Sequence, residues 1–525
     1  MLDKRVRRLL CAIALLTLAY AGLAPRVPSE AARAADDPRF ERVASVVTEK
    51  MKEYRVPGVA LGIWHAGQTA TRGFGVTNLD HPLPVTDDTL FQVGSISKTF
   101  TGTLVMRLVE TGKLRLDALA RSYIPTFRVK DETASREATL LTMLTHMGGW
   151  EGDYFDDTGN GDDALARIVE RMAHLEQVAP FGTLWSYNNA GFYAAARLVE
   201  LATGKPYEQA LRELLLDPLG LERTFIFPTD VMTYRFAVGH GGPADKLTVL
   251  RPWPLARAAH GVGGVTASIK DLLRYGQFHV GDGTTSNGTR ILTQTSMQQM
   301  QATQVVKHGT DDEMAITWHI SNAGSVRQVS HGGSTLGQQA LLTLIPSRQL
   351  IVALLTNAGR GGQLNRDVTR AAIREYIGVA ITDPEPIATP DAELRHYEGK
   401  YGRPYTDVIV SVENGRLMIQ SIQKQGFPTP STPIPPPQPS APYAFYAKDR
   451  LIAVGGPTKG ARGEILRLPD GSIGWIRVGS RVNRRVSRGT TVERSTRGRP
   501  AMARSPESCV AETRGCAALP PECRR

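Results

Sequence analysis

The chain has 525 residues, of which 41% are hydrophobic, 7% aromatic and 22% charged. This composition is typical of a soluble globular protein and excludes a fibrous, collagenous or largely disordered chain. The length exceeds one ordinary domain, so we expect a large domain and at least one smaller one.

The formal net charge of +11 is concentrated at the two ends of the chain. Residues 1–34 contribute +4 and residues 476–525 contribute +8, which leaves −1 for the 441 residues between them. Proteins that bind nucleic acid carry basic side chains across their working surface. A near-neutral body with basic ends therefore argues against a nucleic-acid enzyme or a nucleic-acid partner.

The four cysteines lie at the ends as well, Cys11 near the start and Cys509, Cys516 and Cys523 close to the end. Six residues separate neighbouring tail cysteines and no His accompanies them, which is a poor match to zinc sites. We predict no metal site and a frayed tail. A body without cysteine suits an oxidising compartment.

The first 34 residues have the features of a secretory signal. Basic residues come first, Leu9 to Ala24 is an apolar run, and Ala32-Arg33-Ala34 offers a cleavage site. The run is too short and too weakly apolar for a confident membrane span, which needs about twenty strongly apolar residues. We therefore predict a secreted or periplasmic protein, which would associate with a membrane if the signal stayed uncleaved.

The predicted elements of residues 35–380 begin and end with strands. Asp37 to Tyr54 has helical spacing, and Gly58 to Leu79 holds two extended runs joined by a turn at residues 65–68. Helical stretches then dominate until strands return at residues 338–345 and 350–355. This order predicts one α/β (α+β) domain, an antiparallel sheet flanked by helices, in which the terminal strands share the sheet.

The composition and the hydrophobic pattern of the sequence change after residue 380. Residues 381–393 have the proline content of a linker, and residues 394–486 alternate in short runs with hairpin turns such as Asn414-Gly415. We predict a small antiparallel β domain, a barrel, interrupted by a proline-rich exposed loop at Phe427 to Pro442. Residues 487–525 predict a disordered basic tail.

The chemistry-bearing motif is Ser95-Ile96-Ser97-Lys98, which opens a mostly apolar helical segment. Residues three apart share a helical face, so Ser95 and Lys98 would point into one space. A partly desolvated lysine can accept the proton of a serine nucleophile. Taken alone the motif also fits an ordinary helix-start serine. A second copy, Ser421 to Lys424, lies at a predicted strand end, where the two side chains cannot share a helix face.

Two further motifs follow in order, Trp185 to Gly191 at a loop entering a helix and His331-Gly332-Gly333-Ser334 at a strand. With Ser95-x-x-Lys98, the chain resembles the serine β-lactamase and penicillin-binding-protein-like hydrolase family, in particular its class C-like branch of D-aminopeptidases and esterases. That family carries Ser-x-x-Lys, Tyr-x-Asn, and a Lys or His followed by a small residue and Gly. The resemblance covers about residues 37–378.

The resemblance implies a role for each matching residue. Ser95 would be acylated, and Lys98 and Tyr187 would share the acid and base work, with the first base left open. Asn189 would contact the substrate amide and help to position Lys98. The backbone N–H groups of Ser95 and Ser334 would form an oxyanion hole. Gly332 and Gly333 would be small so that backbone and substrate can approach each other there.

The third motif departs from β-lactamases because His331 stands where they have a lysine. An uncharged imidazole anchors a carboxylate less well than an ammonium does, which disfavours efficient antibiotic hydrolysis. His331 fits a relay near Tyr187, or else a structural histidine at a strand end. Relatives also carry a C-terminal lipocalin-like barrel, which residues 394–485 resemble, and which can cover the active site or mediate homo-oligomerisation.

The sequence thus predicts a serine hydrolase with no metal or organic cofactor. Its substrates would be D-amino-acid-containing peptides or amides or small esters, with weak β-lactam hydrolysis. The alternative is a penicillin-binding sensor or cell-wall-peptide-binding protein that is acylated but does not turn over. No Gly-x-Ser-x-Gly elbow and no His-Glu-x-x-His occur, which disfavours an α/β-hydrolase and a zinc protease.

Overall fold

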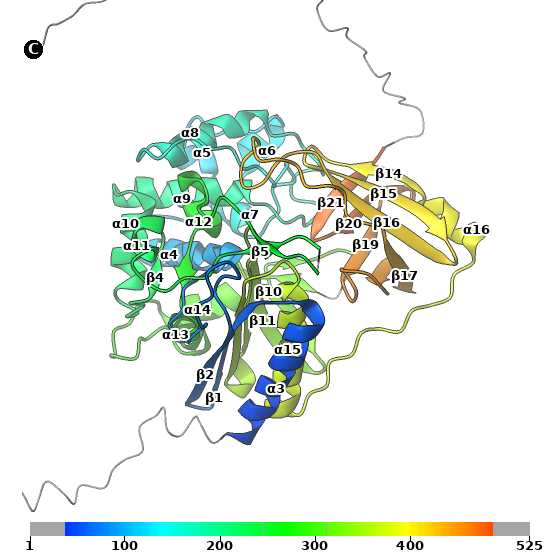
Figure 1. Ribbon diagram of the computed structural model, residues 1–525. Coiled ribbons are helices and arrows are strands. Elements are labelled where there is room, and N and C mark those ends of the chain that lie inside the picture. The colour runs from blue at the N-terminus through cyan, green and yellow to red at the C-terminus, as the bar shows by residue number, and fades with distance from the viewer. Residues whose placement is uncertain (1–36, 244, 311, 487–525) are drawn as a thin grey trace, which may run out of the picture. The chain divides into compact units, whose positions relative to one another are not determined.

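The computed structural model describes residues 37–243, 245–310 and 312–486 (Figure 1). The predicted signal segment, the predicted disordered tail and all four cysteines lie outside the described residues. Within the described ranges, no helix is long and apolar enough to cross a membrane.

The first domain is built on an antiparallel sheet of eight strands. Strand β1, near the start of the domain, pairs with β13, near its end, over seven residue pairs from Val59 and Thr356 to His65 and Leu350. The predicted sharing of one sheet by the terminal strands is therefore confirmed, as is the fold class. The strand order across the sheet is β2 (Gln68–Gly75), β1 (Gly58–His65), β13 (Leu350–Thr356), β12 (Gln339–Ile345), β11 (Val326–Ser334), β10 (His319–Ala323), β9 (Glu313–Met314) and β8 (Val305–Val306).

Local sequence explains the central strands. Ala66 and Gly67 both have positive φ angles, 48° and 87°, so the chain reverses tightly between β1 and β2. Every residue of β13 is buried. A strand that is covered on both faces is apolar without alternation, which accounts for its continuous Leu-Ile-Val-Ala-Leu-Leu sequence.

Helices cover both faces of this sheet (Figure 1). Helices α3 (Pro38–Tyr54) and α15 (Gly361–Ile377) pack together on one face around Phe40, Val43 and Leu364. Helix α13 (Ile269–Val280) packs on the other, beside the helical part of the domain. The main helices of that part are α4 (Ser97–Glu110), α7 (Leu140–Leu144), α8 (Ala164–Arg171), α9 (Ala190–Thr203), α10 (Tyr207–Leu211), α12 (His260–Gly263) and α14 (Gln294–Gln301).

The second domain is a closed antiparallel barrel of eight strands, and its core is filled by side chains that include Tyr401, Val408 and Ile476. Asn414 and Gly415 both have positive φ angles, 51° and 70°, and form the turn predicted for them. The strands are β14 (Gly399–Gly402), β15 (Thr406–Glu413), β16 (Arg416–Gln423), β17 (Ala441–Ala447), β18 (Arg450–Ala453), β19 (Arg462–Arg467), β20 (Ile473–Val478) and β21 (Arg481–Arg485).

The prediction of an exposed loop at Phe427 to Pro442 is wrong at both ends. Pro442 lies in strand β17, opposite Met418. Phe427 and Pro428 line a cavity, and Pro428 is buried. The proline-rich middle, residues 433–440, is exposed as expected.

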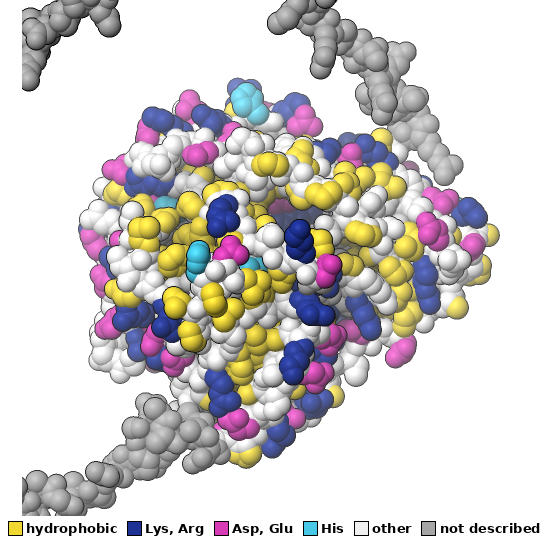
Figure 2. Space-filling model, in the orientation of Figure 1, with side chains coloured by type: hydrophobic (Ala, Val, Ile, Leu, Met, Phe, Trp, Pro, Cys, Tyr) yellow, Lys and Arg dark blue, Asp and Glu magenta, His cyan; other side chains and the backbone are white. Residues whose placement is uncertain are grey.

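The surface in Figure 2 shows basic and acidic side chains intermixed over the described residues in view. This arrangement fits the near-neutral charge of the body. Many of the opposite charges form surface ion pairs, such as Arg72 with Glu41 and Arg121 with Glu132.

Candidate active site

The Ser95 motif lies where the helical part of the domain meets strands β11 and β12 of the sheet. Ser95 is in a single 3₁₀ turn (Gly94–Ile96), and Lys98 follows in the first turn of α4. Lys98 Nζ is 3.0 Å from Ser95 Oγ and donates a 2.8 Å hydrogen bond to the Val262 carbonyl of α12. The three-residue spacing therefore places both groups in one space, as predicted. The second copy, Ser421 to Lys424, spans the end of strand β16 instead.

Lys98 is completely buried and has no ion-pair partner among the described residues. Its Nζ lies 5.1 Å from the ring centre of Tyr187 and 5.6 Å from that of Phe192. Burial, and then the nearby Arg481 cation, hold the pKa of Lys98 well below its usual value. The side chain can therefore be a neutral amine, the form that accepts a proton.

Tyr187 precedes α9 and is buried against Lys98. Its hydroxyl has no hydrogen-bond partner of normal geometry within the described ranges. Burial raises the pKa of Tyr187 well above its usual value, and the neighbouring Ser95 hydroxyl opposes this change. The phenol is therefore protonated at neutral pH. His146 stacks on the ring at 4.3 Å and fixes it from behind.

His331 lies in β11, and its ring centre is 6.2 Å from that of Tyr187. Its Nδ1 donates a 2.6 Å hydrogen bond to the Gly332 carbonyl, and its buried Nε2 has no partner in the described part of the chain. Burial, together with the Lys98 amine, lowers the pKa of His331 to about 3. The imidazole is uncharged, as expected from the sequence, and no hydrogen bond joins it to Tyr187 in the described structure.

The two adjacent glycines of β11 have different surroundings. A Cβ on Gly333 would lie 1.8 Å from the Val93 carbonyl oxygen, so only glycine allows the strand to approach the Ser95 turn. Among the described residues, a Cβ on Gly332 would meet only the Ala340 oxygen at 3.7 Å, so no atom of these residues requires glycine there.

The approach of β11 brings together the two backbones of the predicted oxyanion hole. Gly94 has φ of 53°, and a Cβ there would lie 2.6 Å from the backbone nitrogen of Ser334. The turn that carries Ser95 and the end of β11 are therefore in direct contact. This contact is the geometry that two convergent N–H donors need.

Asn189 lies immediately before α9, and its Nδ2 donates a 2.9 Å hydrogen bond to Asp153 Oδ1. In the described structure it makes no hydrogen bond to Lys98, although the family resemblance implies that it helps to position that lysine. Its partner Asp153 belongs to a buried network of charges that sequence reasoning missed.

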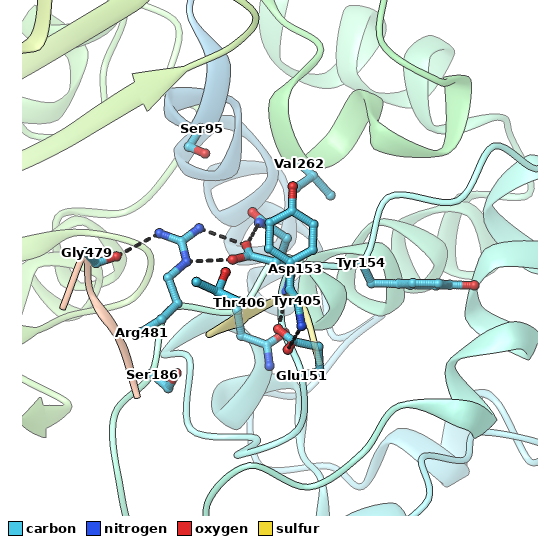
Figure 3. Close-up of polar contacts among 12 residues, drawn as sticks. Ser95, Glu151, Asp153, Tyr154, Ser186, Val262, Tyr405, Thr406, Gly479 and Arg481 are labelled. Carbon is cyan, nitrogen blue, oxygen red and sulfur yellow. Dashed lines mark hydrogen bonds and ion pairs between the residues drawn. The ribbon is translucent and has the colours of Figure 1, made fainter. Parts of the chain in front are cut away.

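That network joins the two domains (Figure 3). Arg481 of β21 contacts Asp153 through Nε at 3.0 Å and Nη2 at 2.9 Å, and Arg403 contacts Asp153 at 2.8 Å and Glu151 at 2.6 Å. Although burial opposes ionisation, the two arginines lower the pKa of Asp153 to about 2. No local pattern could have revealed these pairs, because about 250 to 330 residues separate their members.

The barrel also holds the Tyr187 segment directly. The Tyr187 backbone N–H donates to the Ser480 carbonyl at 2.9 Å, and the Arg481 guanidinium lies 4.7 Å from the Tyr187 ring centre. Trp475 Nε1 donates to the Val178 carbonyl, and Arg477 donates to the Trp185 carbonyl. The barrel therefore contacts the second motif itself and the chain shortly before it.

These side chains surround a cavity of about 600 Å³. Residues from both domains form its wall, and Phe155 of the first domain contacts Tyr405 and Phe427 of the barrel, with ring centres 5.7 and 4.9 Å away. The cavity is lined by the sequence-predicted residues Ser95, Tyr187, Asn189, His331, Gly332, Gly333 and Ser334, and the buried Lys98 lies beneath Ser95. The described residues contain no cluster of three or more His, Cys, Asp or Glu arranged to hold a metal ion.

Comparison with known proteins places this site in context. A family model described as Beta-lactamase matches residues 43–375. The chain is 35% identical over 344 residues to "Penicillin-binding protein 4" of Amycolatopsis lactamdurans, a match that spans 64% of this chain and 90% of that protein.

Three solved structures are similar in fold. SurE matches with a TM-score of 0.65 at 23% identity over 85% of this chain and 99% of its own, and SurE with D-Leu gives the same score at 21% identity. An octameric penicillin-binding protein homologue from Pyrococcus abyssi matches with a TM-score of 0.57 at 21% identity, over 85% of this chain and 99% of its own. Coverage of this extent includes the barrel.

Proposed function

Because the chain belongs to the beta-lactamase family, we propose that it is a serine hydrolase that cleaves amide or ester bonds through an acyl-enzyme on Ser95. The observation that carries this proposal is the 3.0 Å contact between Ser95 Oγ and the buried Lys98 Nζ at a cavity. A hydroxyl becomes a competent nucleophile when a neutral amine at this distance can take its proton.

The two candidate bases have opposite tendencies, which supports one order of events. Burial favours a neutral amine on Lys98 and a protonated phenol on Tyr187. Lys98 would therefore take the proton of Ser95 as Oγ attacks the carbonyl carbon. Tyr187 would donate its proton to the leaving amine or alkoxide and recover one through Lys98. Water then hydrolyses the ester on Ser95.

The oxygen of the tetrahedral intermediate would be held by the N–H groups of Ser95 and Ser334. Their two segments touch because Gly94 and Gly333 have no side chain. Donors fixed before the reaction stabilise the developing negative charge without reorganising, and one such donor contributes about 3–4 kcal/mol in a well-studied serine protease.

The proposed substrates are D-amino-acid-containing peptides or amides, or small esters, with weak β-lactam hydrolysis. The uncharged His331 is a weaker anchor for a β-lactam carboxylate than a lysine would be. The aromatic wall of Phe155, Tyr405 and Phe427 offers an apolar surface to a side chain. A structure of similar fold, SurE, has been solved with D-Leu.

A panel of three substrates tests the proposal: a D-amino-acid amide, a p-nitrophenyl ester of a short acid and a chromogenic cephalosporin. We expect turnover of the amide or the ester, a mass increase on Ser95 that matches the acyl group, and loss of both in Ser95→Ala. Turnover that survives in Ser95→Ala would place the nucleophile elsewhere.

A second candidate is a protein that is acylated by penicillin-like compounds or cell-wall peptides but does not turn over. The 35% identity to a protein named Penicillin-binding protein 4 supports this second candidate function. The two functions differ in the fate of the acyl-enzyme. One equivalent of labelling without steady-state product would support the sensor, whereas continued product release would exclude it.

We further propose that the mature protein is secreted or periplasmic and that it self-associates. The basic and apolar pattern of residues 1–34 supports export. The octameric protein of similar fold supports testing for an oligomer. N-terminal sequencing of the exported protein and light scattering of the purified protein would check the two proposals.

A further inference from the structure

His319 is a cavity-lining residue that the proposed mechanism does not use. It is the first residue of β10, next to β11 in the sheet. Its ring lies nearly parallel to that of Tyr187, at a centre-to-centre distance of 6.2 Å, and 5.1 Å from the ring of His331. His319 therefore forms part of the wall beside the reacting groups.

Behind His319 lies a buried lysine. Lys307 follows strand β8, and only 5% of its surface is exposed. Its Nζ is 3.1 Å from His319 Nδ1 and 4.4 Å from the ring centre of Trp185. No carboxylate of the described residues lies within ion-pair distance of Lys307. Its main polar partner is thus the imidazole.

This contact determines which nitrogen of His319 carries the proton. An ammonium has donors only, so Nδ1 must accept, and the proton of a neutral imidazole is then on Nε2. Burial and the Lys307 charge hold the pKa of His319 well below its usual value, so the ring is neutral. His319 Nε2 has no hydrogen-bond partner among the described residues. It is not fully buried either, because the polar atoms that are both fully buried and without a partner do not include it.

His331 has the opposite arrangement. Its Nδ1–H is directed to the Gly332 carbonyl, which leaves Nε2 as an acceptor. The two histidines of the wall therefore present different groups, an acceptor from His331 and a donor from His319.

We propose that Lys307 and His319 form a donor subsite, in which Lys307 orients the imidazole and His319 Nε2–H binds an acceptor oxygen of the substrate, a carboxylate or an amide carbonyl. This inference rests on the proposed hydrolase function and names what the substrate must carry beyond its scissile bond. The subsite supplies the donor that His331 does not.

The surroundings of the pair give it a pH dependence. Burial lowers the pKa of Lys307 to about 8, Asp312 and Glu464 oppose this change, and Arg477 reinforces it. Besides burial, the titratable groups that lower the pKa of His319 are Lys307, His331, His146 and Arg481, of which the two histidines are neutral. Below pH 8 the ammonium fixes the tautomer. Above pH 8 the neutral amine no longer does, so affinity for the acceptor should fall.

The test is binding to the Ser95→Ala protein, which separates affinity from turnover. Calorimetry would use N-acetyl-D-alanyl-D-leucine and its C-terminal amide, with Lys307→Met and His319→Phe each added to Ser95→Ala. Lys270→Met serves as a control, since that half-exposed lysine pairs with Asp87 and Asp88. Thermal unfolding of each variant reports folding.

We expect about tenfold weaker binding in each variant and no further loss when both are combined. A loss confined to the free acid identifies a carboxylate, and an equal loss for acid and amide identifies a carbonyl. Affinity of the Ser95→Ala protein should fall above pH 8, and this fall should vanish with Lys307→Met. Unchanged affinity in folded His319→Phe would overturn the subsite, whereas turnover without Ser95 would instead overturn the proposed function.

Discussion

Lys98 and its two charged neighbours decide at which pH the proposed nucleophile is active. After burial, the Arg481 cation is the next cause that lowers the pKa of Lys98, and the Asp153 anion opposes it. Because Arg481 is also paired to Asp153, its removal would take away the lowering charge and leave the raising charge less compensated. Both changes push the pKa of Lys98 upward.

Arg481→Gln should therefore move the acid limb of acylation to higher pH. Only the unprotonated amine accepts the serine proton, so the acylation rate falls as the pH drops through the pKa of Lys98. A higher pKa places that fall at a higher pH. Stopped-flow acylation by p-nitrophenyl acetate between pH 5 and 9 would measure it. Arg467→Gln, which removes a remote Arg467–Asp449 pair of the barrel, is the control. An acid limb shifted to lower pH would contradict the electrostatic role given to Arg481.

The neighbouring glycines of β11 give a matched pair of substitutions. Gly333→Ala would force a Cβ against the Val93 carbonyl and separate β11 from the Ser95 turn. We expect a destabilisation of about 1–3 kcal/mol, as for overpacking generally, together with loss of acylation. Gly332→Ala adds only an ordinary contact, so its unfolding midpoint should stay near that of the unaltered protein. Equal unfolding midpoints for the two variants would show that the close approach is not required.

At the scale of elements, sequence patterns that span only a few residues predict the local structure well. Three-residue spacing places Ser95 beside Lys98, and Asn414-Gly415 turns one barrel strand into the next. Tyr187 and His331 have no such link to Ser95 in the sequence, and only the family resemblance predicts that they meet. Lys307 and Arg481 match no motif of that family, so their positions follow only from how β8 and β21 fold against the site.

The loop that carries Asp153 is tied to strand β21 and to the start of α9 by one carboxylate. Asp153→Asn keeps the shape but leaves Arg481 and Arg403 with less compensation, and removing one member of a buried ion pair costs about 3–5 kcal/mol. Urea unfolding at pH 7 would measure the loss. Asp117→Asn removes an exposed pair with Arg115 and should change stability by less than about 1 kcal/mol.

The same carboxylate makes a predictable contribution to acid stability. The pKa of Asp153 is lowered from 3.8 to about 2, so its stabilisation is complete above pH 3.8 and is lost as the pH falls toward 2. This linkage corresponds to roughly 2 kcal/mol. The unfolding midpoint of the unaltered protein should fall between pH 4 and pH 2, in part because Asp153 is protonated. In Asp153→Asn, the contribution of Asp153 to this fall should be absent. An unaltered acid profile in the variant would mean that other carboxylates carry it.

At the scale of the molecule, the described residues of the two domains build one site. The barrel supplies Tyr405, Phe427 and Arg481 to the cavity wall and the Ser480 carbonyl to the Tyr187 backbone. The sequence left open whether such a domain covers the active site or mediates association. In the described structure its strands β20 and β21 lie against the Tyr187 segment. The likeness of this barrel to lipocalins stays a prediction.

A chain that ends at residue 380 should therefore fail as an enzyme, even though it keeps Ser95, Lys98, Tyr187 and His331. Without the barrel, Glu151 and Asp153 lose their arginine partners and Tyr187 loses a backbone hydrogen bond.

The shortened chain should bind acyl donors without forming the Ser95 adduct at a measurable rate, and it should unfold at a lower temperature than the full chain. A chain that ends at residue 486 keeps every contact described at the site and is the matched control. Intact-mass measurement of the acyl adduct and thermal unfolding would compare the three proteins. If residues 1–380 were acylated as fast as the full chain, the barrel would be a neighbour of the site and not a part of it.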